Sequence, residues 1–289
     1  MRDTGPMTGS AAGVSDHTLR APSPLLRGLV DWYVGYRDVG IPAAQHRGLP
    51  SPGLTVILTL DDPLTIAQHP DSAQPAARFD TLVGGLHTAP VLITHDGRQS
   101  GIQLGLSPVG SRALLRRPAA ELAGLHAHGH DVLGGFAVEL RERLRAAASW
   151  DDRFAILDRA LLSRARRSDE RRGMSGEVLR CWQRLLRSGG TAPIAELAAE
   201  TGWSDRHLRA KFRAETGLSP KAAGRVIRFS RARRILQRRA LAGESFRLAE
   251  LAVSCGYFDQ AHLDHEFGLL AGCSPTTWVA TEFQNWKVG

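Results

Sequence analysis

The sequence predicts an α+β protein in two parts, a β-rich barrel or sandwich that ends in helices and an all-α domain that follows it. Three observations predict this arrangement. Short alternating apolar runs separated by turn residues occupy residues 25–107, helical apolar spacing begins after Pro108, and the last third contains one helical unit twice. With 289 residues, the chain is long enough for two domains that each bury a core.

The N-terminal part begins with a segment of low complexity. Residues 1–24 are rich in Gly, Ser, Ala and Pro, which predicts a flexible tail. Apolar residues then alternate with other residues over 54–60 and 102–106, and 91–94 is another short apolar run. Many short strands with frequent Gly, Pro and Asp turns are typical of a small barrel or sandwich.

Helical spacing follows the strands. Residues 132–147 form an amphipathic pattern, and Ser149 is placed to cap a second helix that runs to about Ala165. The stretch 166–176 is rich in Arg, Ser, Asp and Gly, which predicts a linker. We therefore expect four segments: a tail 1–24, a β-rich domain with terminal helices 25–165, a linker 166–176 and a helical domain 177–289.

The helical domain repeats one unit. Leu197, Ala198 and Gly202 recur 54 positions later, whereas the residues matched between His207 and Pro220 recur 55 positions later. The second copy therefore has one extra residue, near Phe258, in its turn. Because both copies keep the same anchors, they are expected to fold in the same way.

The first copy has the pattern of a helix-turn-helix. A helix opened by Pro193 ends at Gly202, Ser204 caps the next helix, and Leu208 and Phe212 share one face of it. The opposite face is cationic and contains Arg206, Arg209 and Arg213. In such a unit the second helix enters the major groove, where Arg makes bidentate contacts with guanine. The alternative is a solvated basic face on an ordinary helical bundle, which the duplication disfavours.

The charge distribution agrees with DNA binding. Residues 1–150 contain 13 basic and 13 acidic residues, so the net charge of +8 is carried entirely by residues 151–289. The predicted helix between the two copies contains seven arginines. Its apolar residues indicate that one face packs between the two copies, and its other face is expected to be cationic. A basic domain beside a neutral one is the pattern expected for phosphate binding.

Roughly residues 178–282 resemble the DNA-binding domain of AraC/XylS-type transcriptional regulators. The resemblance rests on the order A-E-L-A-A-E-T-G-W-S-D-R-H-L-R-A-K-F-R-A-E-T-G-L-S-P-K, an Arg-rich connecting helix, and A-E-L-A-V-S-C-G-Y-F-D-Q-A-H-L-D-H-E-F. It implies two helix-turn-helix motifs joined by a linker helix, and a one-component, sequence-specific regulator that binds double-stranded DNA in successive major grooves. It implies neither enzymatic activity nor a cofactor.

The resemblance also assigns candidate DNA contacts. In the first unit these are Ser204, Arg206, His207, Arg209 and Arg213, with Arg206 and Arg209 as base readers. In the second unit they are Gln260, His262 and His265. Family members commonly have Arg where this chain has His265. Residues 260–270 contain two acidic and no basic residues, against four basic and two acidic in 205–215. We therefore expect the first unit to read bases and the second mainly to position the protein, with pH-dependent help from its histidines.

The N-terminal phrases G-L-P-S-P-G-L-T-V-I-L and G-G-L-H-T-A-P are similar to the sensor-like domain of one subset of these regulators. In the wider family a cupin-like barrel here binds a small effector or mediates dimerisation. The resemblance thus implies a small-molecule effector or a homodimer, and RNA polymerase as a partner of an activator. His46, His87 and His95 lie near predicted strand ends and are candidate ligand-binding residues. We expect no metal, because no Glu follows the H-x-H of residues 126–128 at the cupin interval.

The same residues disfavour other classes of function. A cupin-type metalloenzyme fused to a DNA-binding module is the alternative function, disfavoured by the missing carboxylate and by the lack of nucleotide or nucleophile motifs. A repair alkyltransferase is excluded because residues 1–180 contain no cysteine. An architectural DNA binder would need no neutral sensor-sized domain. No long apolar run follows a basic start, so neither a signal peptide nor a membrane span is expected, and three widely spaced cysteines fit a reducing cytoplasm.

Overall fold

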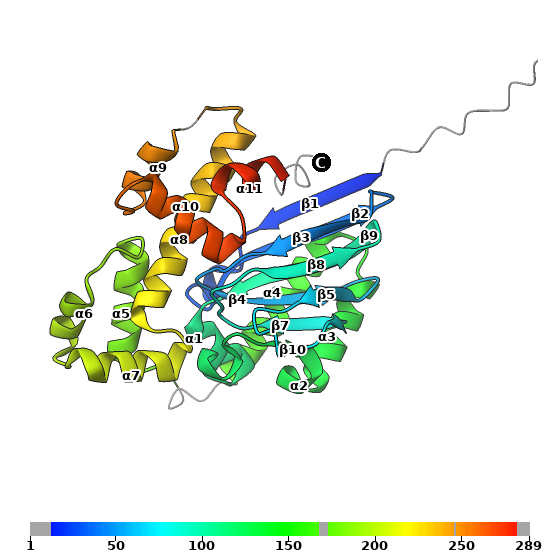
Figure 1. The fold of residues 1–289 in the computed structure, drawn as a ribbon. Coiled ribbons are helices and arrows are strands. Elements are labelled where there is room, and N and C mark those ends of the chain that lie inside the picture. Colours follow the sequence, from blue (N-terminus) through cyan, green and yellow to red (C-terminus); the bar gives the residue numbers. More distant parts are fainter. Residues whose placement is uncertain (1–12, 168–172, 246, 282–289) are drawn as a thin grey trace, which may run out of the picture.

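The computed structural model describes residues 13–167, 173–245 and 247–281 (Figure 1). Its N-terminal part contains two antiparallel sheets. The six-stranded sheet has the order β1-β2-β9-β4-β7-β10 and the four-stranded sheet the order β3-β8-β5-β6. The strands are β1 (Val14–Arg20), β2 (Val30–Val39), β3 (Ala44–Gly48), β4 (Leu54–Thr59), β5 (Leu64–Gln68), β6 (Ala77–Phe79), β7 (Thr81–Gly84), β8 (Val91–His95), β9 (Arg98–Leu106) and β10 (His126–His128).

The two sheets stack as a sandwich. Tyr36, Ile57, Ile66, Phe79 and Ile93 form the core between them. The expected barrel or sandwich is therefore the sandwich: among the described strands, the two sheets keep separate edges and do not close into a barrel. Successive side chains of a strand point to opposite faces, so in β4 Ile57 packs between the sheets while Val56 and Leu58 pack on the other side.

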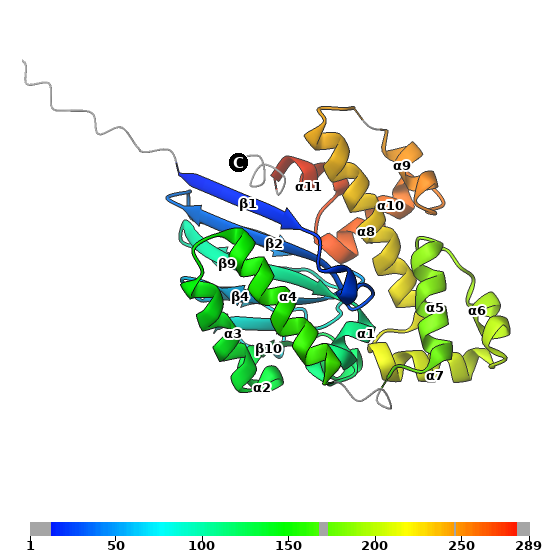
Figure 2. The ribbon, with the colours of Figure 1, turned by 180° about the vertical axis from the view of Figure 1, so that it is seen from behind.

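Two helices cover the other face of the six-stranded sheet (Figure 2). These are α3 (Gly135–Ala146) and α4 (Trp150–Arg166). The side chain of Tyr33 in β2 points to the opposite face of the sheet from that of Tyr36. Its ring stacks on the ring of Phe154 in α4, with 6.0 Å between ring centroids. Ser149 caps α4 by accepting a hydrogen bond from the Asp152 amide, as the sequence predicts.

The expectation of a flexible tail through residue 24 is wrong for its last part. β1 pairs along its whole length with β2, and a 3-10 helix, η1 (Pro24–Leu26), follows it. The strand escaped the sequence pattern because it is an edge strand with little apolar alternation. Polar contacts hold it instead: Ser15 Oγ and His17 Nε2 contact Asp38 Oδ1 at 2.5 and 3.0 Å. Residues 1–12 lie outside the described residues.

Short elements connect the sheets to the helices. They are α1 (Pro108–Gly110), a π-helical turn η2 (Ser111–Leu115), a 3-10 helix η3 (Ala119–Leu122) and α2 (Gly129–Leu133). The predicted linker 166–176 falls between α4 and the next helix, and its residues 168–172 lie outside the described part of the chain.

The C-terminal part is all-helical. Its helices are α5 (Gly176–Arg187), α6 (Ile194–Thr201), α7 (Asp205–Thr216), α8 (Pro220–Leu241), α9 (Leu248–Ser254), α10 (Gln260–Ala271) and α11 (Pro275–Thr281). α8 separates two cores: Ala223 and Ile227 pack with Leu208 and Phe212, whereas Phe229 packs with the α9–α10 unit. None of the helices in the described ranges is long and apolar enough to cross a bilayer.

The N-terminal domain touches the C-terminal end of both α7 and α10. Gly217, which ends α7, lies so close to Ala123 after η3 that a Cβ there would overlap the Ala123 side chain. Gly272, the repeat partner of Gly217, ends α10 beside Pro90 and Arg47. We call these the first and second docking contacts. Corresponding ends of the repeated unit are thus both held by the β-rich domain.

Candidate nucleic-acid interface

The first helix-turn-helix consists of α6 and α7. Gly202 ends α6 in the left-handed conformation, with φ of 70°, which lets the chain turn sharply. Ser204 then caps α7 by accepting a hydrogen bond from the His207 amide at 3.3 Å. Leu208 and Phe212 are fully buried, and Phe212 packs 5.9 Å from Trp182 of α5. These anchors fix which face of α7 points outward.

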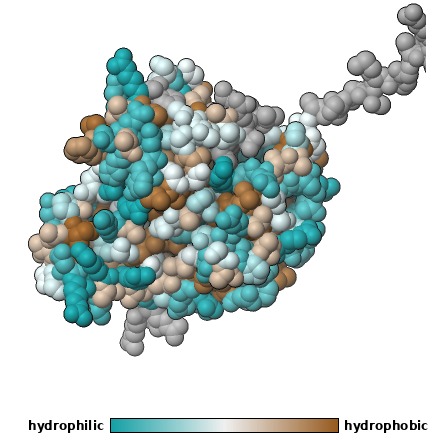
Figure 3. Space-filling model, in the orientation of Figure 1, coloured by the Kyte–Doolittle hydropathy of each residue, from teal (hydrophilic) through white to brown (hydrophobic). Residues whose placement is uncertain are grey.

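The outward face of α7 is cationic, and its arginines form almost no ion pairs within the described residues. Arg206, Arg209 and Arg213 are exposed. Within the described residues, Arg206 and Arg213 have no ion-pair partner, and Arg209 has only a 3.9 Å contact with Asp205. Hydrophilic side chains project from the surface over α7 (Figure 3). Such a face can accept phosphates or guanine edges without first breaking an internal ion pair.

The acidic residue at the end of α7 is turned away from this face. Glu215 pairs with Arg112 of the N-terminal domain, with 2.7 Å between Nη2 and Oε2, and both side chains are mostly buried. This ion pair belongs to the first docking contact. In the sequence Glu215 counts against the cationic face, and its partner could not be predicted because the two residues are 103 positions apart.

The second helix-turn-helix consists of α9 and α10. Asp259 caps α10 by accepting a hydrogen bond from the His262 amide at 2.8 Å. Its turn carries the extra residue of the second copy, Phe258, whose side chain is 88 % exposed. A hydrophobic protrusion lies over this unit (Figure 3). The sequence located the insertion but gave no sign that an aromatic ring would stand free in solvent.

A contact between His and an aromatic ring recurs in both units. His207 meets the Trp203 ring edge-on at 4.9 Å, and His262 meets the Tyr257 ring edge-on at 5.2 Å. His262 also accepts a hydrogen bond from the Phe258 amide at 3.3 Å. The imidazole of each unit therefore lies against its own turn, while His265 and Gln260 are exposed on α10.

α10 lacks the cations of α7. Its face carries no Lys or Arg, and Asp264 lies one turn after Gln260. Glu266 is buried and receives hydrogen bonds from Arg225 Nε to both carboxylate oxygens at 2.9 Å. Only one of the two acids counted from the sequence therefore remains to repel DNA.

The arginines of α8 divide into two groups. Some stabilise the domain: Arg225 pairs with Glu266, and Arg228 donates to the Gly190 carbonyl at 2.8 Å. Burial beside Arg234 lowers the pKa of Arg233 to about 10. Of the other four, Arg231, Arg234 and Arg238 are exposed and Arg239 is half-buried. The cationic face expected on this helix is thus narrower than its seven arginines suggest.

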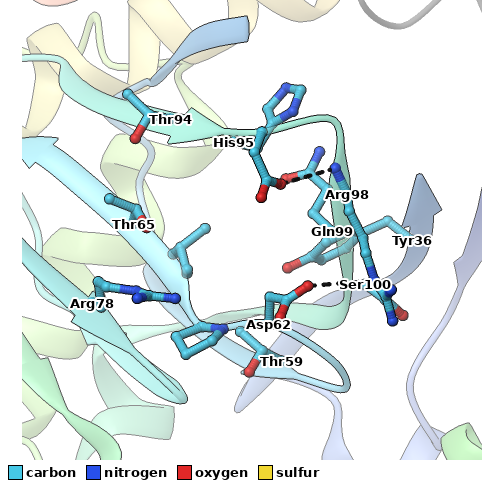
Figure 4. Close-up of a pocket in the computed structure, with 13 residues that line it drawn as sticks. Tyr36, Thr59, Asp62, Thr65, Arg78, Thr94, His95, Arg98, Gln99 and Ser100 are labelled. Carbon is cyan, nitrogen blue, oxygen red and sulfur yellow. Dashed lines mark hydrogen bonds and ion pairs between the residues drawn. The ribbon is translucent and has the colours of Figure 1, made fainter. Parts of the chain in front are cut away.

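The N-terminal domain contains a polar cavity of about 450 Å³ at one end of the sandwich (Figure 4). Thirteen residues from both sheets and their turns line it: Tyr36, Thr59, Asp62, Pro63, Leu64, Thr65, Arg78, Thr94, His95, Asp96, Arg98, Gln99 and Ser100. Of the candidate ligand residues only His95 lines this cavity, and its Nδ1 accepts a hydrogen bond from the Gly97 amide at 3.2 Å. The other twelve are not among the ligand-binding residues predicted from the sequence.

The three candidate histidines do not converge. His46 lies beside His95, with 5.9 Å between ring centroids, and burial lowers its pKa to about 4. His87 instead lies beside His126, with 6.2 Å between ring centroids. The Nδ1 atom of His126 is 2.8 Å from Nδ1 of His69. Burial and the neighbouring imidazoles lower the pKa of His126 to about 3. Nowhere in the described chain do three or more His, Cys, Asp or Glu side chains form a group that could hold a metal ion.

Comparisons with known proteins match the two parts separately. Residues 197–281 match the family described as "Helix-turn-helix domain", and residues 19–128 match a "Domain of unknown function (DUF6597)". No curated protein matches the chain. The double helix-turn-helix defines the class: the chain is a DNA-binding transcriptional regulator. Its DNA-binding domain is of the AraC/XylS type.

Among solved structures, ToxT from Vibrio cholerae O395 is similar over 93 % of this chain and 97 % of its own, at 10 % identity and a TM-score of 0.49. The C-terminal domain of AraT from Geobacillus stearothermophilus covers 37 % of this chain and 87 % of its own, at 22 % identity and a TM-score of 0.34. The AraC-like transcriptional activator CuxR is similar over 75 % of this chain and 79 % of its own, at 16 % identity and a TM-score of 0.29.

Proposed function

We propose that the α7 unit supplies most of the base readout and that the α10 unit mainly positions the protein on double-stranded DNA. One observation carries this proposal. α7 presents Arg206, Arg209 and Arg213 outward with at most one weak internal ion pair, whereas α10 presents no cation. Counterion release by cations supplies most of the affinity for phosphates, and Arg is the commonest reader of guanine.

The α10 unit is proposed to bind without strong electrostatic attraction. Phe258 stands exposed at the start of α10, where an apolar ring can contact a thymine methyl group. Gln260 and His265 are available for hydrogen bonds to bases or phosphates. His207 and His262 are less suited to base readout, because each imidazole lies against an aromatic ring of its own turn.

The N-terminal domain is proposed to bind a small effector in its polar cavity. Such an effector changes DNA binding only if its affinity differs between the competent and incompetent arrangements of the two domains. The two docking contacts are the surfaces through which that difference would act. A homodimer, contact with RNA polymerase by an activator, and a cytoplasmic location complete the proposal. It includes no catalytic step.

A gel-shift titration of paired variants tests the division of labour. The operator would first be obtained by sequencing the genomic fragments that the purified protein retains. Arg209→Ala should then weaken binding by about tenfold or more and relax specificity at one base pair, since a bidentate contact contributes about 1–3 kcal/mol. His265→Ala should cost about threefold or less. A loss for His265→Ala that equals or exceeds the loss for Arg209→Ala would contradict the proposal.

A further inference from the structure

The cavity at the end of the sandwich contains an arginine with no internal partner. Arg78 extends from β6 towards the centre of the cavity (Figure 4). Within the described chain its guanidinium forms neither an ion pair nor a hydrogen bond. The other arginine of the cavity, Arg98, is 3.4 Å from Asp62. Arg78 is therefore the cation of this cavity that is free to bind a ligand.

The wall next to Arg78 offers neutral hydrogen-bonding groups. Thr65 of β5 and Thr94 of β8 are opposite each other in the sheet register, and both line the cavity. Across the cavity, beside Gln99 and Ser100, burial and Asp38 raise the pKa of Tyr36, so its hydroxyl keeps its proton at neutral pH (Figure 4). Hydroxyl groups of this kind both donate and accept, so they suit a ligand that itself carries hydroxyls.

The opposite wall is acidic. Asp62 pairs with Arg98, and Asp96 accepts a hydrogen bond from the Arg98 amide at 3.3 Å. Carboxylates accept hydrogen bonds from a ligand hydroxyl but repel a second negative charge. The cavity is therefore asymmetric, with an unpaired cation on one side and acceptors on the other.

We propose that this cavity binds a small polyhydroxy monocarboxylate, an acid of the sugar-acid class. Its carboxylate would lie on the guanidinium of Arg78, whose planar fork matches a carboxylate with two parallel hydrogen bonds. Its hydroxyls would meet Thr65, Thr94 and the carboxylates of Asp62 and Asp96. The cavity volume of about 450 Å³ is within the range of small-molecule sites. This inference rests on the proposed effector role and names the chemistry of the effector.

Isothermal titration of the full chain with three six-carbon compounds tests the proposal. Gluconate has one carboxylate, sorbitol has none and glucarate has two. Gluconate should bind, sorbitol should bind about tenfold more weakly or not at all, and glucarate should be weakened by the acidic wall. Equal binding of gluconate and sorbitol overturns the proposal. So does failure of gluconate and of the shorter acids threonate and glycerate to bind at millimolar concentration.

Two matched variants assign any binding to Arg78. Arg78→Gln should weaken gluconate about tenfold or more, because it removes a charge-assisted contact but keeps a hydrogen-bonding side chain. Arg27→Gln makes the same change in charge at an exposed residue outside the cavity and should leave binding unchanged. An unchanged affinity in Arg78→Gln, or equal losses in the two variants, overturns the assignment.

Operator binding without acid separates this inference from the proposed function. Arg78→Gln should bind the operator as the wild-type chain does, because Arg78 lies outside the DNA-binding domain. If the acids fail to bind while the operator is recognised, only the ligand class is wrong. If gluconate binds in an Arg78-dependent way while no operator is retained, the fault lies with the proposed function.

Discussion

Buried imidazoles make the N-terminal domain sensitive to acid. A hydrogen bond of 2.8 Å joins His69 Nδ1 and His126 Nδ1, and both residues lie in the interior with His87 close to His126. Neighbouring groups are mostly neutral: the Phe79 ring, the Gln74 side chain and backbone carbonyls. Burial lowers the pKa of all three histidines, so the folded chain holds them uncharged while the unfolded chain takes up protons.

The free energy of unfolding should therefore fall in mild acid. A depressed folded pKa gives stability that is complete above the unfolded pKa of about 6.5 and is lost as the pH falls towards the folded values. Each histidine contributes a slope of up to about 1.4 kcal/mol per pH unit in that window. Urea unfolding at about pH 7 and about pH 5 measures it. His126→Gln should flatten the dependence, and His265→Gln, at an exposed site, should not. Equal slopes in all three chains would contradict this expectation.

At the scale of an element, two glycines that end the helices of the first unit have different surroundings. Gly202 ends α6 with φ of 70° and a Cβ there would meet nothing within 4 Å. Gly217 ends α7 with φ of 79°, and a Cβ there would overlap Ala123 of the other domain. Both positions need a glycine for the left-handed backbone conformation. Only at position 217 does the first docking contact also leave no space for a Cβ.

The two alanine variants separate these requirements. Gly202→Ala should cost about 1 kcal/mol, the strain of a left-handed alanine. Gly217→Ala should cost that amount plus about 1–3 kcal/mol of overpacking against Ala123. Calorimetric unfolding of both variants measures the difference. If Gly217→Ala is no more destabilising than Gly202→Ala, the docking contact does not constrain the helix end.

The same elements show what the sequence predicts and what it does not. Both helix-turn-helix units were predictable because their anchors, such as Leu208 and Phe212, and their left-handed glycines are local and repeated. β1 was not, because an edge strand held by Asp38 needs no apolar alternation. The cavity was not either: Arg78, Thr94 and Tyr36 reach it from three separate strands, and no spacing along the chain records their convergence.

At the scale of the whole molecule, the domains are joined by more than the chain between α4 and α5. The apolar cluster of the six-stranded sheet and α4 continues through α5 into Phe212 and Ile227. Leu49 packs on the separate core of the second unit. The Arg112–Glu215 ion pair adds a polar contact at the first docking contact. The orientation of both α7 and α10 therefore depends on the N-terminal domain.

A double-mutant cycle on that ion pair measures part of this coupling. Arg112→Ala, Glu215→Ala and the double variant should give an interaction energy of about 0.5–3 kcal/mol in thermal unfolding, since both side chains are mostly buried. Arg117 and Glu121 form an exposed pair at 3.6 Å and serve as the control, with an expected energy below about 1 kcal/mol. An interaction energy near zero for Arg112 and Glu215 would show that the contact does not join the domains.

β8 has one end at the cavity and the other at the second docking contact. Thr94 and His95 line the cavity, and Pro90, immediately before the strand, lies beside Gly272. The strand spans about 16 Å and is hydrogen-bonded to β3 on one side and β5 on the other. Because β8 is hydrogen-bonded to a neighbour on each side, it is hard to stretch. A shift of Thr94 at the cavity would therefore also shift Pro90 at the second docking contact. One strand of the domain thus connects the cavity directly to the second docking contact.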